Sequence, residues 1–299
     1  MINIQDFIHP DDASALNNLK SIPALPTLLE KVMQYGYEEM DWSRNISSNV
    51  RINERQMPEI YGRLIAVCRK LQMPIPELYL QMSPIPNAWT SGNTRTYIVV
   101  TLGLIRRFQE EELDAVLAHE CGHILCHHVL YSMLANAIFD LGDSLMDSIL
   151  GSIGNAAMIP IKQALLGWSR ASELSADRVA CVVSSPETMI RVLAKLDGIP
   201  PIILKDMNLD EWATQGADYE KMRHGSGVSK VVRYISNTDL THPYGPVRAY
   251  EVRRWSGGTH YLKLQAQMQQ LTDGKICPMC GAAISEDWAF CRSCGAKLK

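Results

Sequence analysis

One short segment of the chain carries residue types that could perform metal-dependent hydrolysis, in the order His119-Glu120-Cys121-Gly122-His123. Residues four apart share one face of a helix, so the imidazoles of His119 and His123 could converge on one zinc ion. The carboxylate of Glu120, one step round the helix, could then take a proton from a metal-bound water as general base. The same residues would also fit a buried amphipathic helix without a metal, so this segment alone does not distinguish a zinc site from an ordinary core helix.

A third ligand has to come from elsewhere, because a catalytic zinc binds three protein ligands and keeps one position open. In one class of zinc peptidases the helix continues with a glycine and a third histidine, but Cys126 and Val129 stand at those two positions. His127 lies too far along an unbroken helix to reach the same ion. We therefore expect His127 and His128 to lie on the surface.

Glu173 is the better candidate for the third ligand. It stands four residues before Asp177 in a helical segment, residues 167–184, so both carboxylates share one face. Glu173 could bind the metal, while Asp177 accepts a hydrogen bond from the outer N–H of a ligand histidine and fixes its tautomer. An ordinary solvated pair of acids would show the same spacing, which leaves that alternative open.

A second metal signal lies in the last 23 residues, where two C-x-x-C-G motifs occur and ten residues lie between Cys280 and Cys291. Four thiolates at this spacing predict one tetrahedral structural zinc in a zinc ribbon, which has no open catalytic position. Two disulfides are the alternative, but the N-terminus does not resemble a secretory signal, which favours metal binding and a cytoplasmic location. The four ligands would be Cys277, Cys280, Cys291 and Cys294.

The composition restricts the class of protein. Of the 299 residues, 46% are hydrophobic and 20% are charged, which excludes a disordered chain and leaves ample material for a core. A net charge of −3 does not favour nucleic acid as a partner; the zinc ribbon could instead bind a protein. The uncharged stretch 148–161 is too short to span a membrane, so we interpret residues 129–168 as amphipathic helices that could contact a membrane surface. The remaining cysteines are expected to be small core residues: Cys68, Cys121, Cys126 and Cys181.

Hydrophobic periodicity places these residues on an α+β, predominantly helical framework. Short β-type runs end in a hairpin turn at residues 92–93, and a long buried helix begins near residue 109 and extends to Val129. The free edge formed by Asn87, Ala88 and Trp89 could accept an extended peptide as an added strand, although a plain edge strand would look the same. Residues 199–240 are expected to be rich in loops, and helices are expected at residues 54–72, 167–184, 186–196 and 246–271.

Over residues 50–255 the sequence resembles the HtpX and CAAX prenyl endopeptidase type of zinc metallopeptidase, a gluzincin of peptidase family M48. The transmembrane helices of that family are not evident here. Four motifs in the same order carry the resemblance: Asn87-Ala88-Trp89-Thr90-Ser91-Gly92, the helix at 113–124, Glu173-x-x-x-Asp177-Arg178, and His242-Pro243 followed by Arg248.

The resemblance implies a role for each matching residue. His119, His123 and Glu173 would be zinc ligands, Glu120 the general base and proton shuttle, and Asp177 a support for a ligand histidine. His242 would stabilise the oxyanion, or orient the site together with Arg248. A loop anchor is the alternative for His242-Pro243.

These inferences together predict a gluzincin-type fold with a small antiparallel sheet over the zinc helix and a small C-terminal zinc ribbon. The predicted regions are an N-terminal helical extension (1–50), a metallopeptidase domain (51–271) and the ribbon (275–299). The predicted activity is zinc-dependent endopeptidase action on flexible or misfolded polypeptides, with one catalytic and one structural Zn²⁺. The alternatives are a client-binding scaffold without catalysis and a module that acts through the ribbon.

Overall fold

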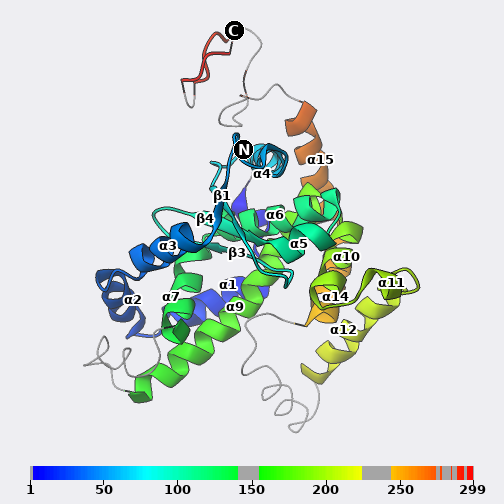
Figure 1. Ribbon diagram of the computed structural model, residues 1–299. Coiled ribbons are helices and arrows are strands. Elements are labelled where there is room, and N and C mark those ends of the chain that lie inside the picture. The colour runs from blue at the N-terminus through cyan, green and yellow to red at the C-terminus, as the bar shows by residue number, and fades with distance from the viewer. Residues whose placement is uncertain are drawn as a thin grey trace.

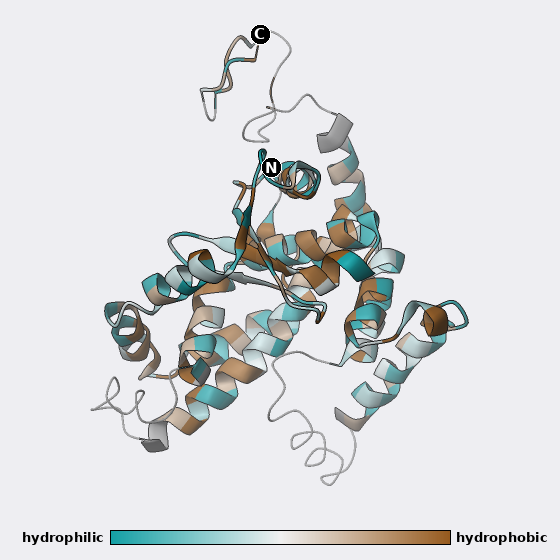
Figure 2. Ribbon diagram, viewed as in Figure 1, coloured by the Kyte–Doolittle hydropathy of each residue, from teal (hydrophilic) through white to brown (hydrophobic). Residues whose placement is uncertain are grey.

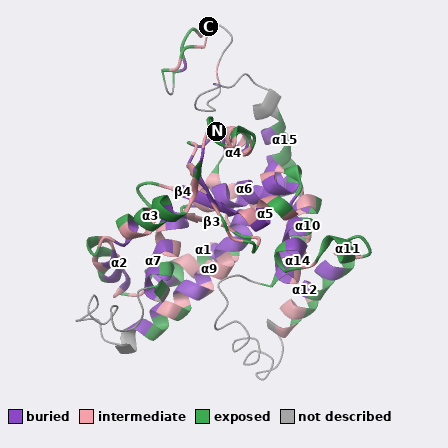
Figure 3. Ribbon diagram, viewed as in Figure 1, coloured by how far each residue is buried: buried purple, intermediate pink, exposed green. Residues whose placement is uncertain are grey.

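The computed structural model shows a helical protein with one small sheet, in which helix α6 (Glu110–Leu125) lies at the centre (Figure 1). Residues 115–122 of α6 are all buried (Figure 3). The apolar residues of Figure 2 gather on the strands and on the helices around α6. The predicted α+β, predominantly helical class is confirmed. The structure describes residues 3–140, 155–223 and 244–273, together with residues 277, 284, 288–292 and 295–298.

The sheet has four strands in the order β1-β2-β4-β3. The pairs β1–β2 and β3–β4 are antiparallel, but β2 and β4 run parallel, so the prediction of an antiparallel sheet is wrong for the central pair. Every residue of β4 is buried, which is typical of a strand in the interior of a sheet that is covered on both faces. The edge strands are β1 and β3, and β3 contacts α6. The strands are β1 (Val50–Ile52), β2 (Glu77–Gln81), β3 (Ala88–Ser91) and β4 (Tyr97–Thr101).

The predicted turn between β3 and β4 is confirmed, and Gly92 is the residue that permits it. Its φ of +80° is unfavourable for residues other than glycine. A Cβ at this position would lie 2.1 Å from the carbonyl oxygen of Arg95. The connection at residues 92–96 brings β4 back beside β3, so that Ser91 pairs with Tyr97.

Helix α6 begins with a reciprocal capping box between Gln109 and Glu112. It ends at Leu125, so the prediction of one continuous helix to Val129 is wrong. His127 adopts a left-handed conformation with φ +60°, which turns the chain before α7 (Val129–Asp140) begins. This break changes where His128 points.

Helix α9 (Asn155–Val183) packs closely on α6. Gly122 makes the approach feasible, because a Cβ there would lie 3.0 Å from Ala176 Cα and 3.1 Å from Val179 Cβ. The glycine inside the histidine motif therefore lets the two helices that carry the candidate ligands meet.

Helix α1 packs on α9, and the N-terminal helices share a second apolar cluster with α7 and α9. Leu19 and Leu28 are fully buried in this cluster beside Trp168. The elements are a 3₁₀ turn η1 (Ile4–Asp6), α1 (Pro10–Lys20), α2 (Leu25–Gln34) and α3 (Tyr37–Ser48).

Two helical predictions need correction in the C-terminal half. The region 199–240, expected to be loop-rich, contains α11 and α12 up to residue 223, and its remainder lies outside the described residues. The single helix expected over 246–271 is split at Gly257 and Gly258, residues of low helix propensity. None of the helices in the described parts of the chain is both long and apolar enough to cross a membrane. The remaining helices are α4 (Pro58–Leu71), α5 (Leu102–Arg107), α10 (Pro186–Leu196), α11 (Pro201–Leu204), α12 (Leu209–Arg223), α14 (Gly245–Ser256) and α15 (Thr259–Asp273).

Candidate metal centre

The structure brings His119, His123 and Glu173 to one point between α6 and α9, and a ligand atom from each lies within 4.8 Å of the others. The two Nε2 atoms are 3.1 Å apart. The Glu173 carboxylate approaches His119 Nε2 at 3.2 Å and His123 Nε2 at 3.4 Å. Two imidazoles and one carboxylate form a donor set suited to a catalytic zinc.

A further contact decides which ring nitrogen of His119 faces this point. Asp177 Oδ1 lies 3.0 Å from His119 Nδ1, so that nitrogen donates a hydrogen bond to the carboxylate. The Nε2 of a neutral His119 then carries a lone pair directed at Glu173 and His123. Lone pairs and a carboxylate that face one another at this distance repel, whereas a cation among them is coordinated. The residues present therefore fit a zinc ion.

Asp177 and Arg248 supply the electrostatic support. Arg248, from α14, donates two hydrogen bonds to Asp177, at 2.8 and 2.6 Å, and its Nη1 lies 3.0 Å from Glu173 Oε2. Burial works to raise the pKa of Asp177, but the Arg248 guanidinium outweighs it and holds the pKa below its usual value. Without a metal, burial works to lower the pKa of His119, but hydrogen bonds to Asp177 and Glu173 raise it to about 10, because a proton on Nε2 then takes the place of a cation. This concentration of negative charge favours a cation.

Glu120 is buried beside the metal ligands, and its partner is a residue that the sequence analysis did not single out. The Thr90 hydroxyl, on β3, lies 2.7 Å from Glu120 Oε2 and donates a hydrogen bond to it. Strand alternation could have indicated this contact, because Ala88 and Thr90 lie on the same face of β3. Thr90 holds the carboxylate in a fixed orientation.

Two clefts meet at this site, and both are lined by Asn87, Ala88, His119, Glu120 and Glu173. Both are therefore bordered by the start of the edge strand. The first has a volume of about 250 Å³ and apolar walls from Val116, Met189, Val192, Leu193 and Leu196. The second has a volume of about 270 Å³ and includes small polar side chains from Ser132, Asn136, Ser169 and Ser172.

His128 corrects a sequence prediction, because it is only 1% exposed rather than on the surface. The end of α6 at Leu125 and the left-handed turn at His127 fold it back beneath His123. Its Nδ1 lies 3.0 Å from His123 Nδ1, and its Nε2 lies 3.0 Å from Asp12 Oδ2. His127 is exposed, as predicted.

Of the other predicted site residues, the structure describes some and leaves others outside the described ranges. His242 lies outside the described residues, as do Cys280 and Cys294. Cys277 and Cys291 are buried, and Cys291 lies in a tight turn in which the Gly295 N–H donates to its carbonyl oxygen at 2.8 Å. The cysteines expected in the core are buried: Cys68, Cys121, Cys126 and Cys181.

Comparison with known proteins gives two family matches. Residues 52–256 match the model of Peptidase family M48, and residues 276–298 match that of a zinc-ribbon domain. The chain is 32% identical over 267 residues to the plastoglobule-localized metallopeptidase 48, chloroplastic, of Arabidopsis thaliana, covering 88% of this chain and 76% of the relative.

A bacterial relative and a solved structure are more distant. The chain is 30% identical over 171 residues to a protease HtpX homolog of Syntrophobacter fumaroxidans, covering 48% of this chain and 61% of that protein. It aligns with the crystal structure of S. mikatae Ste24p at a TM-score of 0.39 and 16% identity, covering 81% of this chain and 64% of that one. At that score the structural likeness carries no further argument.

Proposed function

The chain belongs to peptidase family M48 and is a metalloprotease, and on this premise we propose that it is a zinc-dependent endopeptidase acting on flexible or misfolded polypeptides. The observation that carries the proposal is the convergence of two imidazoles and one carboxylate beside the buried carboxylate of Glu120. A scaffold that only bound clients would have no use for a base held in this place.

The mechanism assigns a task to each side chain. His119, His123 and Glu173 would hold a zinc ion, which lowers the pKa of a water molecule and polarises the scissile carbonyl. Glu120 takes the proton of the attacking water and returns it to the leaving amine. Thr90 keeps the carboxylate turned toward the cleft through its hydrogen bond.

We expect replacement of Thr90 by valine to lower kcat roughly 10- to 150-fold, since a hydrogen bond to a charged group contributes about 1.5–3 kcal/mol. KM should change little, because the hydroxyl faces Glu120 and not the edge that binds the peptide. Kinetics with a fluorogenic peptide measure both constants. Thr90→Ser keeps the hydroxyl and should retain most of the activity; an equal loss in both variants would refute this role.

The proposed substrate follows from the shape of the site. On β3, one edge pairs with β4, and the opposite edge can bind an extended peptide through main-chain hydrogen bonds. A folded protein does not present its backbone in this way. The first cleft favours a large apolar side chain on one side of the cleaved bond, and the serine and asparagine side chains of the second also admit a polar one on the other side.

An experiment with one substrate in two states tests this proposal. We expect the zinc-loaded chain to cleave a reduced, alkylated and unfolded protein and to leave its native, disulfide-bonded form intact. Removal of the catalytic zinc by a chelator should abolish cleavage, and added Zn²⁺ should restore it, as measured by gel analysis and mass spectrometry of the new termini. Equal cleavage of both forms would exclude the substrate class, and no cleavage by the fully metallated chain would exclude the activity.

The C-terminal cysteines form a separate part of the proposal. Cys277, Cys280, Cys291 and Cys294 would hold one structural zinc, which the zinc-ribbon match and the turn at Cys291 support. A protein partner for this ribbon and a cytoplasmic location with peripheral membrane contact are further proposals. So is the oxyanion role of His242.

A further inference from the structure

A buried carboxylate from the N-terminal helix α1 lies next to the candidate metal centre, outside the region that matches the peptidase family. Asp12 is 1% exposed and accepts hydrogen bonds from Trp168 Nε1 at 3.1 Å and from Ser175 Oγ at 2.6 Å. Its third partner is His128 Nε2 at 3.0 Å. Three donors around one carboxylate compensate for its burial in the ionised form.

The contact between His128 and His123 determines which nitrogen of each ring carries a hydrogen. Because an ionised Asp12 only accepts, His128 donates to it from Nε2, and the Nδ1 of a neutral His128 is left as an acceptor. The Nδ1 atoms of His123 and His128 are 3.0 Å apart, so His123 donates from Nδ1. The Nε2 atom of His123 then carries a lone pair that faces Glu173. This tautomer of His123 is the one that can bind a metal.

The two ligand histidines are therefore supported in related ways. The Asp177 carboxylate contacts His119 directly, at 3.0 Å. The Asp12 carboxylate is connected to His123 only through the imidazole of His128. The His128 ring is held between the rings of His123 and Trp168, with centroid distances of 5.2 and 5.7 Å. We propose that Asp12 is a positioning residue of the metal centre, which acts through His128 to hold His123 in its metal-binding tautomer, so that α1 helps to retain the zinc. This inference rests on the proposed zinc site.

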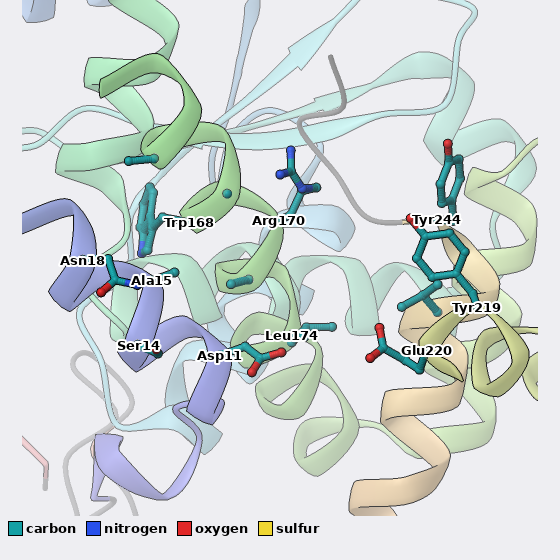
Figure 4. A pocket seen from close by; sticks show the side chains of 14 residues that line it. Asp11, Ser14, Ala15, Asn18, Trp168, Arg170, Leu174, Tyr219, Glu220 and Tyr244 are labelled. Atoms are coloured by element: carbon teal, nitrogen blue, oxygen red, sulfur yellow. The ribbon is translucent and has the colours of Figure 1, made fainter. Parts of the chain in front are cut away.

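The neighbouring Asp11 offers a matched control. Both aspartates lie in the first turn of α1, so either substitution by asparagine removes the same charge from the helix N-terminus. Asp11, however, lines a cavity of about 390 Å³ together with Arg170 and Tyr219, and this cavity is separate from the two clefts at the metal centre (Figure 4). It therefore reports on the general effect of changing α1.

The experiment measures metal affinity in the full chain by competition with a chelator, without reference to activity. Cobalt substitution separates the two sites, because thiolate coordination gives intense charge-transfer absorption that an imidazole–carboxylate site lacks. We expect Asp12→Asn to weaken metal binding at the histidine site by about 10- to 100-fold, and Asp11→Asn to leave it unchanged. The ribbon site should be unaffected in both variants.

Should Asp12→Asn fail to fold, His128→Phe provides the second test, because it keeps a ring between His123 and Trp168 but removes both nitrogens. We expect the same loss of affinity. Unchanged affinity in the folded variant, or an equal loss in Asp11→Asn, would overturn the inference. If His123→Ala loses the metal and Asp12→Asn does not, the inference alone fails. If His123→Ala keeps the metal, the proposed zinc site fails with it.

Discussion

Replacement of Glu120 by glutamine is expected to lower kcat for peptide cleavage by roughly 10²- to 10⁴-fold, the usual contribution of a general base. Glutamine has nearly the same shape and can still accept the hydrogen bond that Thr90 donates at 2.7 Å. It cannot take a proton from the attacking water. Because Glu120 is not among the three groups that converge on the metal point, the proposed catalytic and structural zinc ions should both be retained. Peptide kinetics and metal analysis of the same preparation measure the two effects.

Glu111→Gln is the matched control for this variant, since it makes the same chemical change at an exposed position of the same helix. We expect its kcat to equal that of the wild type. Substantial cleavage by Glu120→Gln with the metal fully bound would contradict the mechanism. Loss of metal in that variant would show that Glu120 acts on the zinc site itself.

Replacement of Asp177 by asparagine should have the largest effect on stability. Asp177 is 2% exposed and accepts two hydrogen bonds from the buried Arg248 as well as the one from His119. Asparagine has one acceptor oxygen and no charge, so Arg248 would lose its closest carboxylate and keep Glu173 as its ion-pair partner among the described residues. We expect the free energy of unfolding to fall by about 3–5 kcal/mol. Zinc affinity should fall about 10- to 100-fold, because His119 loses its orienting carboxylate. Denaturant unfolding and chelator competition measure these changes.

Glu187→Gln tests whether the cost comes from burial. Glu187 pairs with Arg253, another arginine of α14, at 2.7 Å, but its side chain is 61% exposed. An exposed ion pair contributes about 0–1 kcal/mol, so this variant should be nearly as stable as the wild type. Comparable destabilisation by Asp177→Asn and Glu187→Gln would refute the argument from the buried arginine.

The local parts of the structure could be predicted from the sequence because they depend on residues close together in the chain. Helical periodicity placed His119 and His123 on one face of a buried helix. The turn residue Gly92 predicted the hairpin, because few other residues adopt its backbone conformation. Carboxylates four residues apart identified Glu173 and Asp177 as a pair, although spacing alone could not distinguish a ligand from a solvated acid.

The strand pairing in the sheet and the end of helix α6 could not be predicted without the tertiary structure. The parallel pairing of β2 and β4 depends on which strands occupy the buried centre of the sheet. A run of apolar residues predicts a buried strand but not the strand with which it pairs. The end of α6 at Leu125 depends on a left-handed residue that is not a glycine, His127, and such residues are rare. The prediction of an unbroken helix consequently put His128 on the surface.

By itself, the sequence determined which side chains could bind a metal and which helix would carry them, since both follow from residue type and from the repeat of a helix. Only the tertiary structure decided what supports those side chains: Arg248 behind Asp177, Thr90 behind Glu120, and Asp12 behind His128. The partners in these contacts are 71, 30 and 116 residues apart. No local pattern encodes such contacts, because they form only when the helices and the edge strand pack around α6.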